Sequence, residues 1–273
     1  MDFSAGDIII EYDDSDDEAK HALIWVLDAN GKTVIHSKDV GNLQGVVQQS
    51  VGALAITDDD VKYLVYRYED STVAAAAAWF ATRWATRSDD PMVAGMVKYA
   101  ATKNQVVKAS VPFGRRGDEY QTEEAWTANS LVRAVRAWHR GLAGVKLSSR
   151  KGISCSQFVT YCFQAASLHA ALHNMCLQSQ DAKNFLLGPQ NFVALKKGNR
   201  YSLIYEALKS VEKDLSGCIP PGMLVDAKTT DADNLQNCLE RGDSKFKCVG
   251  AVATDNPKKP TKAWIEAAEE KSD

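Results

Sequence analysis

The hydrophobic pattern of this chain changes its period near residue 70, and this change limits the fold more than any other feature. Upstream, short runs rich in β-branched residues predict four strands, at 6–12, 20–27, 32–37 and 61–68. Downstream, alanine-rich and amphipathic segments predict helices. Strands that come first and helices that follow are typical of α+β proteins rather than of alternating βαβ units. We therefore predict an α+β fold in which an antiparallel β-sheet packs against a helical subdomain.

The same patterns place the later elements of the chain. Helices are predicted at 71–84, 91–102, 122–140, 155–166, 201–214 and 231–240, and short strands at 223–225 and 247–253. No repeat and no internal linker interrupts this order, so we expect one domain over residues 1–255. That domain is expected to be strand-rich over 1–70, helical over 71–215 and mixed over 216–255. A flexible tail is expected over 256–273.

The composition is that of an ordinary globular domain. Hydrophobic residues make up 45% of the 273 residues and charged residues 25%, which suffices to bury a core without covalent crosslinks. A net charge of −3 offers no basic surface, so we expect no nucleic-acid partner. The six cysteines form no C-x-x-C pair, which predicts reduced thiols in a reducing compartment.

The sequence predicts a cytoplasmic protein. Its first seven residues lack the basic and apolar regions of a secretory signal. The apolar run at 73–81 falls short of the ~18 residues that a spanning helix needs, so we expect no stable membrane insertion. Secretion as an effector by a signal-independent route would leave no mark in the sequence.

Cys155 stands where a helix is expected to begin. Ser154 is followed three residues later by Gln157, which is the spacing of a capping box and predicts Cys155 as the first helical residue. The unpaired N–H groups and the positive end of a helix dipole favour a thiolate there. A thiolate is a nucleophile, whereas a cysteine that is only a small buried hydrophobe is inert. Cys155 is therefore the candidate nucleophile, with simple burial as its alternative.

A catalytic thiolate needs a base, which is most often histidine. His21 and His36 lie on the second and third predicted strands and are expected to share one face of the sheet. A two-residue turn at Asn30-Gly31 would set His36 opposite Trp25. It would leave the two histidines four residues apart along the strands, roughly 13 Å. A loop four residues longer would place them opposite each other, so the sequence predicts their face but not their separation.

These features together resemble the circularly permuted NlpC-type papain-like proteins, which include the YiiX-like proteins and lecithin:retinol acyltransferase. In that family the histidine strand precedes the cysteine helix. The segments that carry the resemblance, in order, are Gly6-Asp7-Ile8-Ile9, the strand from His21, Val34-Ile35-His36, Tyr63-Leu64-Val65-Tyr66-Arg67 with the following helix, Ser154-Cys155-Ser156-Gln157-Phe158-Val159 and Pro220-Pro221-Gly222-Met223-Leu224. The resemblance covers roughly residues 4–225 and implies a permuted papain-like fold.

The resemblance also implies roles for individual residues. Cys155 matches the nucleophile, and His21 matches the general base that holds the thiolate as an ion pair. His36 matches the third polar residue, which orients the base in the acyltransferase branch. Other branches use a carboxylate or an amide there, so Glu11 and Asp39 remain alternatives for this third position.

The expected reaction is attack by the Cys155 thiolate on an acyl carbon, through a tetrahedral oxyanion and a thioester. N–H groups at the helix start beside Ser154 are expected to stabilise the oxyanion, with Tyr12 as a candidate side-chain donor. No cofactor and no metal is required. The substrate is a peptide, a protein or an acyl ester, and the lack of a membrane anchor favours a soluble amide over a lipid.

Three alternatives remain open at this stage. The chain could be a binding module that keeps the fold without the chemistry, or a lipid acyltransferase or phospholipase of the same family. A metal enzyme is the third, because His169, His173 and Cys176 follow an H-x3-H-x2-C spacing on a predicted helix. A polar helix face with one buried thiol explains that last pattern better, since no fourth ligand accompanies it.

Overall fold

A computed structural model gives the arrangement of most of the chain. It describes residues 3–15, 17–28, 31–40, 43–50, 61–85, 126–144, 153–173, 179–187, 209–253 and 263–265. Within these ranges the protein is a mixed α+β structure, as the change of hydrophobic period predicts. No helix among them is long and apolar enough to cross a membrane.

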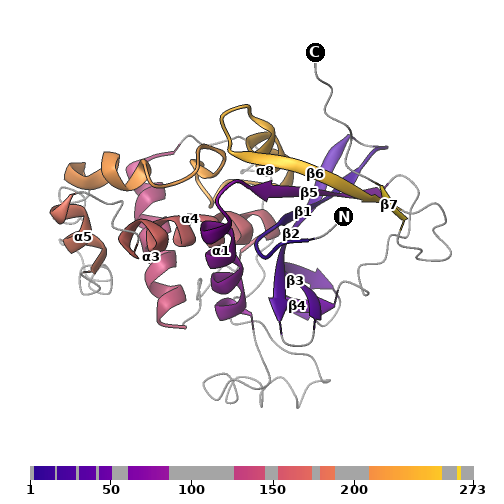
Figure 1. Ribbon diagram of the computed structural model, residues 1–273, viewed down its shortest axis with the longest axis horizontal. Helices are drawn as coiled ribbons and strands as arrows, with labels where there is room; N and C mark the ends of the chain where they lie inside the picture. Colours follow the sequence, from indigo (N-terminus) through magenta and orange to yellow (C-terminus); the bar gives the residue numbers. More distant parts are fainter. Residues whose placement is uncertain are drawn as a thin grey trace.

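The strands form one antiparallel sheet of seven strands, in the order β4-β3-β2-β1-β5-β6-β7 (Figure 1). Their bounds are β1 Ile8–Asp13, β2 Glu18–Asp28, β3 Gly31–Val40, β4 Leu43–Ser50, β5 Val61–Tyr68, β6 Phe246–Ala253 and β7 Ala263–Ile265. Every pairing between neighbouring strands is antiparallel. The predicted antiparallel sheet is therefore confirmed, although β4 and β7 were not expected from the sequence.

The three-residue strand β7 lies within the tail predicted over 256–273, of which the structure describes residues 263–265. Residues 263–265 pair with the end of β6, where Ala251 is the partner of Ile265 and Ala253 is the partner of Ala263. Three residues carry too little pattern to be recognised as a strand, and an edge position is open to any extended segment that reaches it.

The hairpin between β2 and β3 has a different register from the one that the sequence suggests. Asp28 pairs with Gly31, so the turn lies one residue earlier and Trp25 opposes Val34 rather than His36. Continuing this register, His36 lies only two residues from the position opposite His21, instead of four. This register reduces the offset of the two histidines along the strands from four residues to two.

The helices lie together on one side of β1 and β2 (Figure 1). Their bounds are α1 Ser71–Trp84, α3 Ala128–Leu142, α4 Cys155–His173, α5 Gln180–Leu187, the 3-10 turn η4 Pro221–Met223 and α8 Ala232–Glu240. α3 begins six residues later than predicted, because Thr127 and Ser130 form a capping box there. The strand predicted at 223–225 is instead the end of η4 and a single bridge residue. The helix predicted at 91–102 lies outside the described residues.

The sheet has two faces with separate cores. On the helix side, β1 and β2 contribute Ile8, Ile10, Ala22 and Ile24 to one large cluster. The opposite face carries a smaller cluster built from Ile9, Leu23, Trp25, Val34 and Tyr63. Successive strand residues point to opposite faces of the sheet. A residue whose two neighbours in the chain belong to one cluster therefore lies on the face of the other cluster.

α4 is the central helix of the larger core. Fourteen of its residues are buried, and it packs against α1, α3 and both β2 and β3. A helix that is apolar on nearly all sides is one that other elements surround. Its first residue, Cys155, is therefore held in a fixed position beside the sheet.

Candidate active site

The start of α4 is capped as the sequence predicts. The Ser154 N–H donates to the Gln157 side-chain oxygen at 3.1 Å, and the Gln157 N–H donates to the Ser154 Oγ at 3.4 Å. This reciprocal pair is a capping box, and α4 begins at Cys155. The Cys155 thiol therefore lies among the unpaired N–H groups of the first turn.

The β2 and β3 strands separate where α4 begins. Their ladder ends at the pair Ile24–Ile35, although β2 continues back to Glu18 and β3 continues to Val40. The Trp25 N–H donates to the carbonyl of Asp7, the residue before β1, at 2.8 Å. Because the backbone N–H groups of successive strand residues point to alternate sides of the strand, the Ala22 N–H points away from β1 and toward β3. We call the region between the two strands beyond Ile24–Ile35 the strand fork.

The start of α4 lies against this region from the helix side of the sheet. The Ala22 N–H donates to the Cys155 sulfur in place of a ladder partner. From the other strand, the Ser37 Oγ donates to the Ile153 carbonyl at 2.7 Å. Cys155 itself packs against the core on the helix side of the sheet.

Two influences act in opposite directions on the Cys155 thiol. Burial raises its pKa, and the charge of Glu11 raises it further. The backbone N–H groups of Ala22, Ser156 and Cys155 itself lower it, because each stabilises the thiolate. The net effect is a pKa above the ordinary value of the thiol, which means that the free protein holds this proton.

His21 and His36 form a hydrogen-bonded pair. The His21 Nε2 and the His36 Nδ1 are 2.6 Å apart, and the rings meet edge to face with centroids 4.9 Å apart. His36 is 1% exposed. The prediction that both side chains share one face is confirmed, and their separation, which the sequence left open, is that of a direct hydrogen bond.

Both imidazoles belong to the sheet face opposite the helices. His36 follows Ile35, which belongs to the helix-side core, and His21 is the cross-strand partner of Glu11, which follows Ile10 of that same core. The pair bridges β2 and β3 on this face, whereas Cys155 packs against the core on the helix side of the sheet. His21 directly precedes Ala22, the residue that donates to the sulfur.

The hydrogen-bonded partner of His21 is His36, although one of the alternatives also lies near. Glu11 is the cross-strand partner of His21 and accepts a hydrogen bond from the Tyr63 hydroxyl at 3.3 Å. The side chain of Asp39 lies outside the described residues.

Tyr12 is directed away from this group. It packs against the helix-side core, and its hydroxyl donates to Asp17, which lies between β1 and β2. This bond is the main cause that raises the pKa of Tyr12 to about 12. The hydroxyl hydrogen of Tyr12, which would have to bind the oxyanion, is therefore already bonded to Asp17. The backbone N–H groups around Cys155 are better placed for that role.

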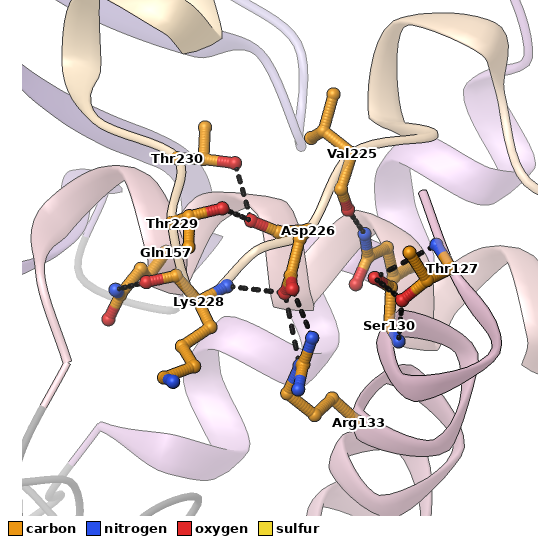
Figure 2. A network of polar contacts seen from close by, with 10 residues as sticks. Thr127, Ser130, Arg133, Gln157, Val225, Asp226, Lys228, Thr229 and Thr230 are labelled. Carbon is orange, nitrogen blue, oxygen red and sulfur yellow. Dashed lines mark hydrogen bonds and ion pairs between the residues drawn. The ribbon is translucent and has the colours of Figure 1, made fainter. Parts of the chain in front are cut away.

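A turn from the C-terminal part of the chain lies against the start of α4, and sequence reasoning missed it. The Ser156 Oγ donates to the Thr230 carbonyl at 2.8 Å, and the Gln157 Nε2 donates to the Lys228 carbonyl (Figure 2). Asp226 with Thr229 and Thr230 is a turn-forming composition, which could have indicated the turn. Nothing in the sequence indicates the helix that it contacts.

The alternative metal site is not assembled among the described residues. His169 and His173 are adjacent, with ring centroids 4.3 Å apart, but the His169 Nδ1 accepts from the Trp138 indole N–H at 3.4 Å. Cys176 lies outside the described residues. Within the described part of the chain no three His, Cys, Asp or Glu side chains gather as metal ligands would.

Comparisons with protein-family models, with curated proteins and with solved structures give no match to this chain. The family resemblance therefore stands on the sequence segments quoted above, and the function has to be argued from the site itself.

Proposed function

We propose that this protein is a cysteine hydrolase of the permuted papain-like class, which cleaves an amide or ester bond through a thioester on Cys155. One observation carries the proposal: the Cys155 sulfur accepts the N–H of Ala22, the residue next to His21, and the His21 imidazole is bonded to His36. The proposal requires the His21 ring to reach the Cys155 sulfur, which packs on the helix side of the sheet, from the opposite face.

In the proposed reaction the His21 imidazole, which is hydrogen-bonded to His36, takes the proton of the Cys155 thiol. The sulfur attacks the acyl carbon, and the oxyanion accepts hydrogen bonds from the N–H groups of Cys155 and Ala22. The His21 imidazolium then protonates the leaving amine or alcohol, which leaves a thioester, and His21 activates the water that hydrolyses it.

The raised thiol pKa bears on this mechanism. A thiol that is mostly protonated in the free protein requires proton transfer to His21 as part of the attack, rather than a preformed ion pair. The same observation favours the second candidate, a binding module in which Cys155 is only a buried thiol. Peptide and isopeptide amides and lipid or other acyl esters all supply the required acyl carbon.

Alkylation and acyl transfer separate the two candidates. The protein is treated with iodoacetamide over a range of pH, and the adduct at each cysteine is followed by mass spectrometry. In parallel, release of p-nitrophenol from p-nitrophenyl acetate reports acyl transfer. We expect Cys155→Ala to abolish acyl transfer and His21→Ala to reduce it about a hundredfold, the usual contribution of a general base. Cys248→Ala, which removes an exposed cysteine, serves as the matched control and should leave the rate unchanged.

The binding module predicts a different result. Cys155 would then be alkylated more slowly than the exposed Cys248, and His21→Ala would not change its rate. Acyl transfer that survives in Cys155→Ala would also rule out the proposed nucleophile.

A further inference from the structure

Asp226 is a buried carboxylate at the centre of the turn that contacts α4. It is 1% exposed, and it accepts from both the Nε and an Nη of Arg133 on α3 (Figure 2). Its side chain also accepts the N–H of Lys228 at 3.0 Å. A buried carboxylate remains charged only when donors surround it in this way.

The main chain of Asp226 is bonded as heavily as its side chain. Its carbonyl accepts the Thr229 and Thr230 N–H groups at 2.9 and 3.2 Å. It also accepts both threonine hydroxyls, at 3.1 and 2.9 Å. Side chain and carbonyl together fix the conformation of the turn at 226–230 and tie it to α3.

The carbonyls of this turn hold the first turn of α4. Lys228 accepts from Gln157 and Thr230 accepts from Ser156, the two residues that follow closely on Cys155. Gln157 is also one half of the capping box, so the turn and the cap share a side chain. Further along the helix, the Gln164 Nε2 donates to the Met223 and Val225 carbonyls at 3.0 and 2.9 Å.

We propose that Asp226 is a positioning residue for Cys155, which acts through Arg133, the 226–230 turn and the first turn of α4. This inference depends on the proposed function, because it concerns the reactivity of the same sulfur. The Ser156 and Cys155 N–H groups that face the sulfur belong to the held turn, and the Ala22 N–H does not. Movement of the helix start would therefore shift the sulfur relative to the N–H on β2.

The chain supplies a matched control for this proposal. Asp7 is also 1% exposed, accepts from two nitrogens of Arg67 at 2.9 and 2.7 Å, and accepts one backbone N–H, from Ser4 at 2.7 Å. It lies just before β1 and four residues before Glu11, the cross-strand partner of His21, which corresponds to roughly 13 Å along the strand. Asp7→Asn therefore weakens an equivalent buried ion pair away from Cys155.

The test compares Asp226→Asn with Asp7→Asn in the full-length protein. The rate of iodoacetamide alkylation at Cys155 is measured against pH, together with kcat and KM for p-nitrophenyl acetate and the unfolding midpoint in urea. We expect both variants to lose stability. Only Asp226→Asn should move the alkylation profile of Cys155 to higher pH and lower kcat by about tenfold to a hundredfold, with a smaller change in KM. Thr230→Val, which removes one bond of the turn and keeps the ion pair, should give the same changes in smaller size.

The outcomes distinguish this inference from the proposed function. If wild-type Cys155 transfers acyl groups while Asp226→Asn and Thr230→Val keep its pH profile and kcat, the positioning role is wrong and the enzyme remains. The role is also wrong if Asp7→Asn changes the profile as much as Asp226→Asn does. Should Asp226→Asn fail to fold, the Thr230→Val result decides alone. A wild-type protein without acyl transfer overturns the proposed function itself.

Discussion

At the scale of single residues, the chemistry of the site depends on how the imidazole of His21 is held. Its Nε2 is bonded to a nearly fully buried histidine, which fixes the ring plane. A buried imidazole is a weaker orienting group than a carboxylate because it carries no negative charge. His36 would therefore act mainly by holding the tautomer and the orientation of His21.

We predict that His36→Ala lowers kcat for p-nitrophenyl acetate by about tenfold or more, because the base loses its orienting partner. His36→Gln should recover part of that loss, since its amide oxygen can accept from the His21 Nε2. The measurement is steady-state kinetics with kcat and KM determined separately. His173→Ala, at the exposed end of α4, is the control and should leave both constants unchanged. Equal kcat values in wild type and His36→Ala would show that the pair has no part in catalysis.

At the scale of elements, α4 combines a structural task with a chemical one. Its body is surrounded by α1, α3, β2 and β3, and its first turn is held from the capping box, from Ser37 and from the 226–230 turn. These contacts oppose the fraying that is usual at helix ends. The same first turn supplies the N–H groups that face the sulfur.

We predict that Ser154→Ala lowers the free energy of unfolding by about 1 kcal/mol, the usual loss for an N-cap side chain, and also lowers the alkylation rate of Cys155. Ser179→Ala is the matched change, because the Ser179 Oγ accepts the Ala182 N–H at 3.1 Å and caps α5. Urea unfolding should show similar losses in both proteins, with slower alkylation only in Ser154→Ala. An alkylation rate that falls equally in both would mean that general loosening, and not the cap at Cys155, is responsible.

At the scale of the whole molecule, one large core unites the helices with one face of the sheet, and several titratable groups are buried within or beside it. Burial is the main cause that raises the pKa of Tyr161, on α4, to about 12. Burial also raises the pKa of Cys162, the next residue, well above its ordinary value. The folded state therefore keeps protons that the unfolded chain releases at lower pH.

This arrangement predicts a loss of stability in alkaline solution. Because the folded pKa of Tyr161 lies above the unfolded value of about 10, its contribution is complete below that pH and is lost as the pH rises toward 12. For a difference of about two pKa units the loss is about 2–3 kcal/mol. Urea unfolding of wild type and Tyr161→Phe at pH 8 and pH 11 measures it, and the variant should depend less on pH. Identical pH dependence in the two proteins would contradict this account.

Local patterns in the sequence were sufficient for much of the fold. The strands at β1, β2, β3, β5 and β6, the helix after residue 70, the cap at Ser154 and the shared face of the two histidines all follow from spacing and side-chain type over short stretches. Such features depend on contacts between residues near in the chain or directly paired across a turn. The strand β4 and the three-residue β7 were missed because their sequences lack a clear alternation.

The tertiary structure decided the positions of the two histidines and of Cys155 relative to one another. A turn moved by one residue changes the register of a whole hairpin, and this brought His36 within hydrogen-bond distance of His21. The end of the β2–β3 ladder, which opens a place for the start of α4, depends on packing between segments more than a hundred residues apart. The bonds from Asp226 to α3 and from its turn to α4 also join residues far apart in the sequence, by 93 and 74 positions. Local patterns set each element and its chemical groups, whereas long-range packing sets the distances between them, because those distances depend on every element that lies between.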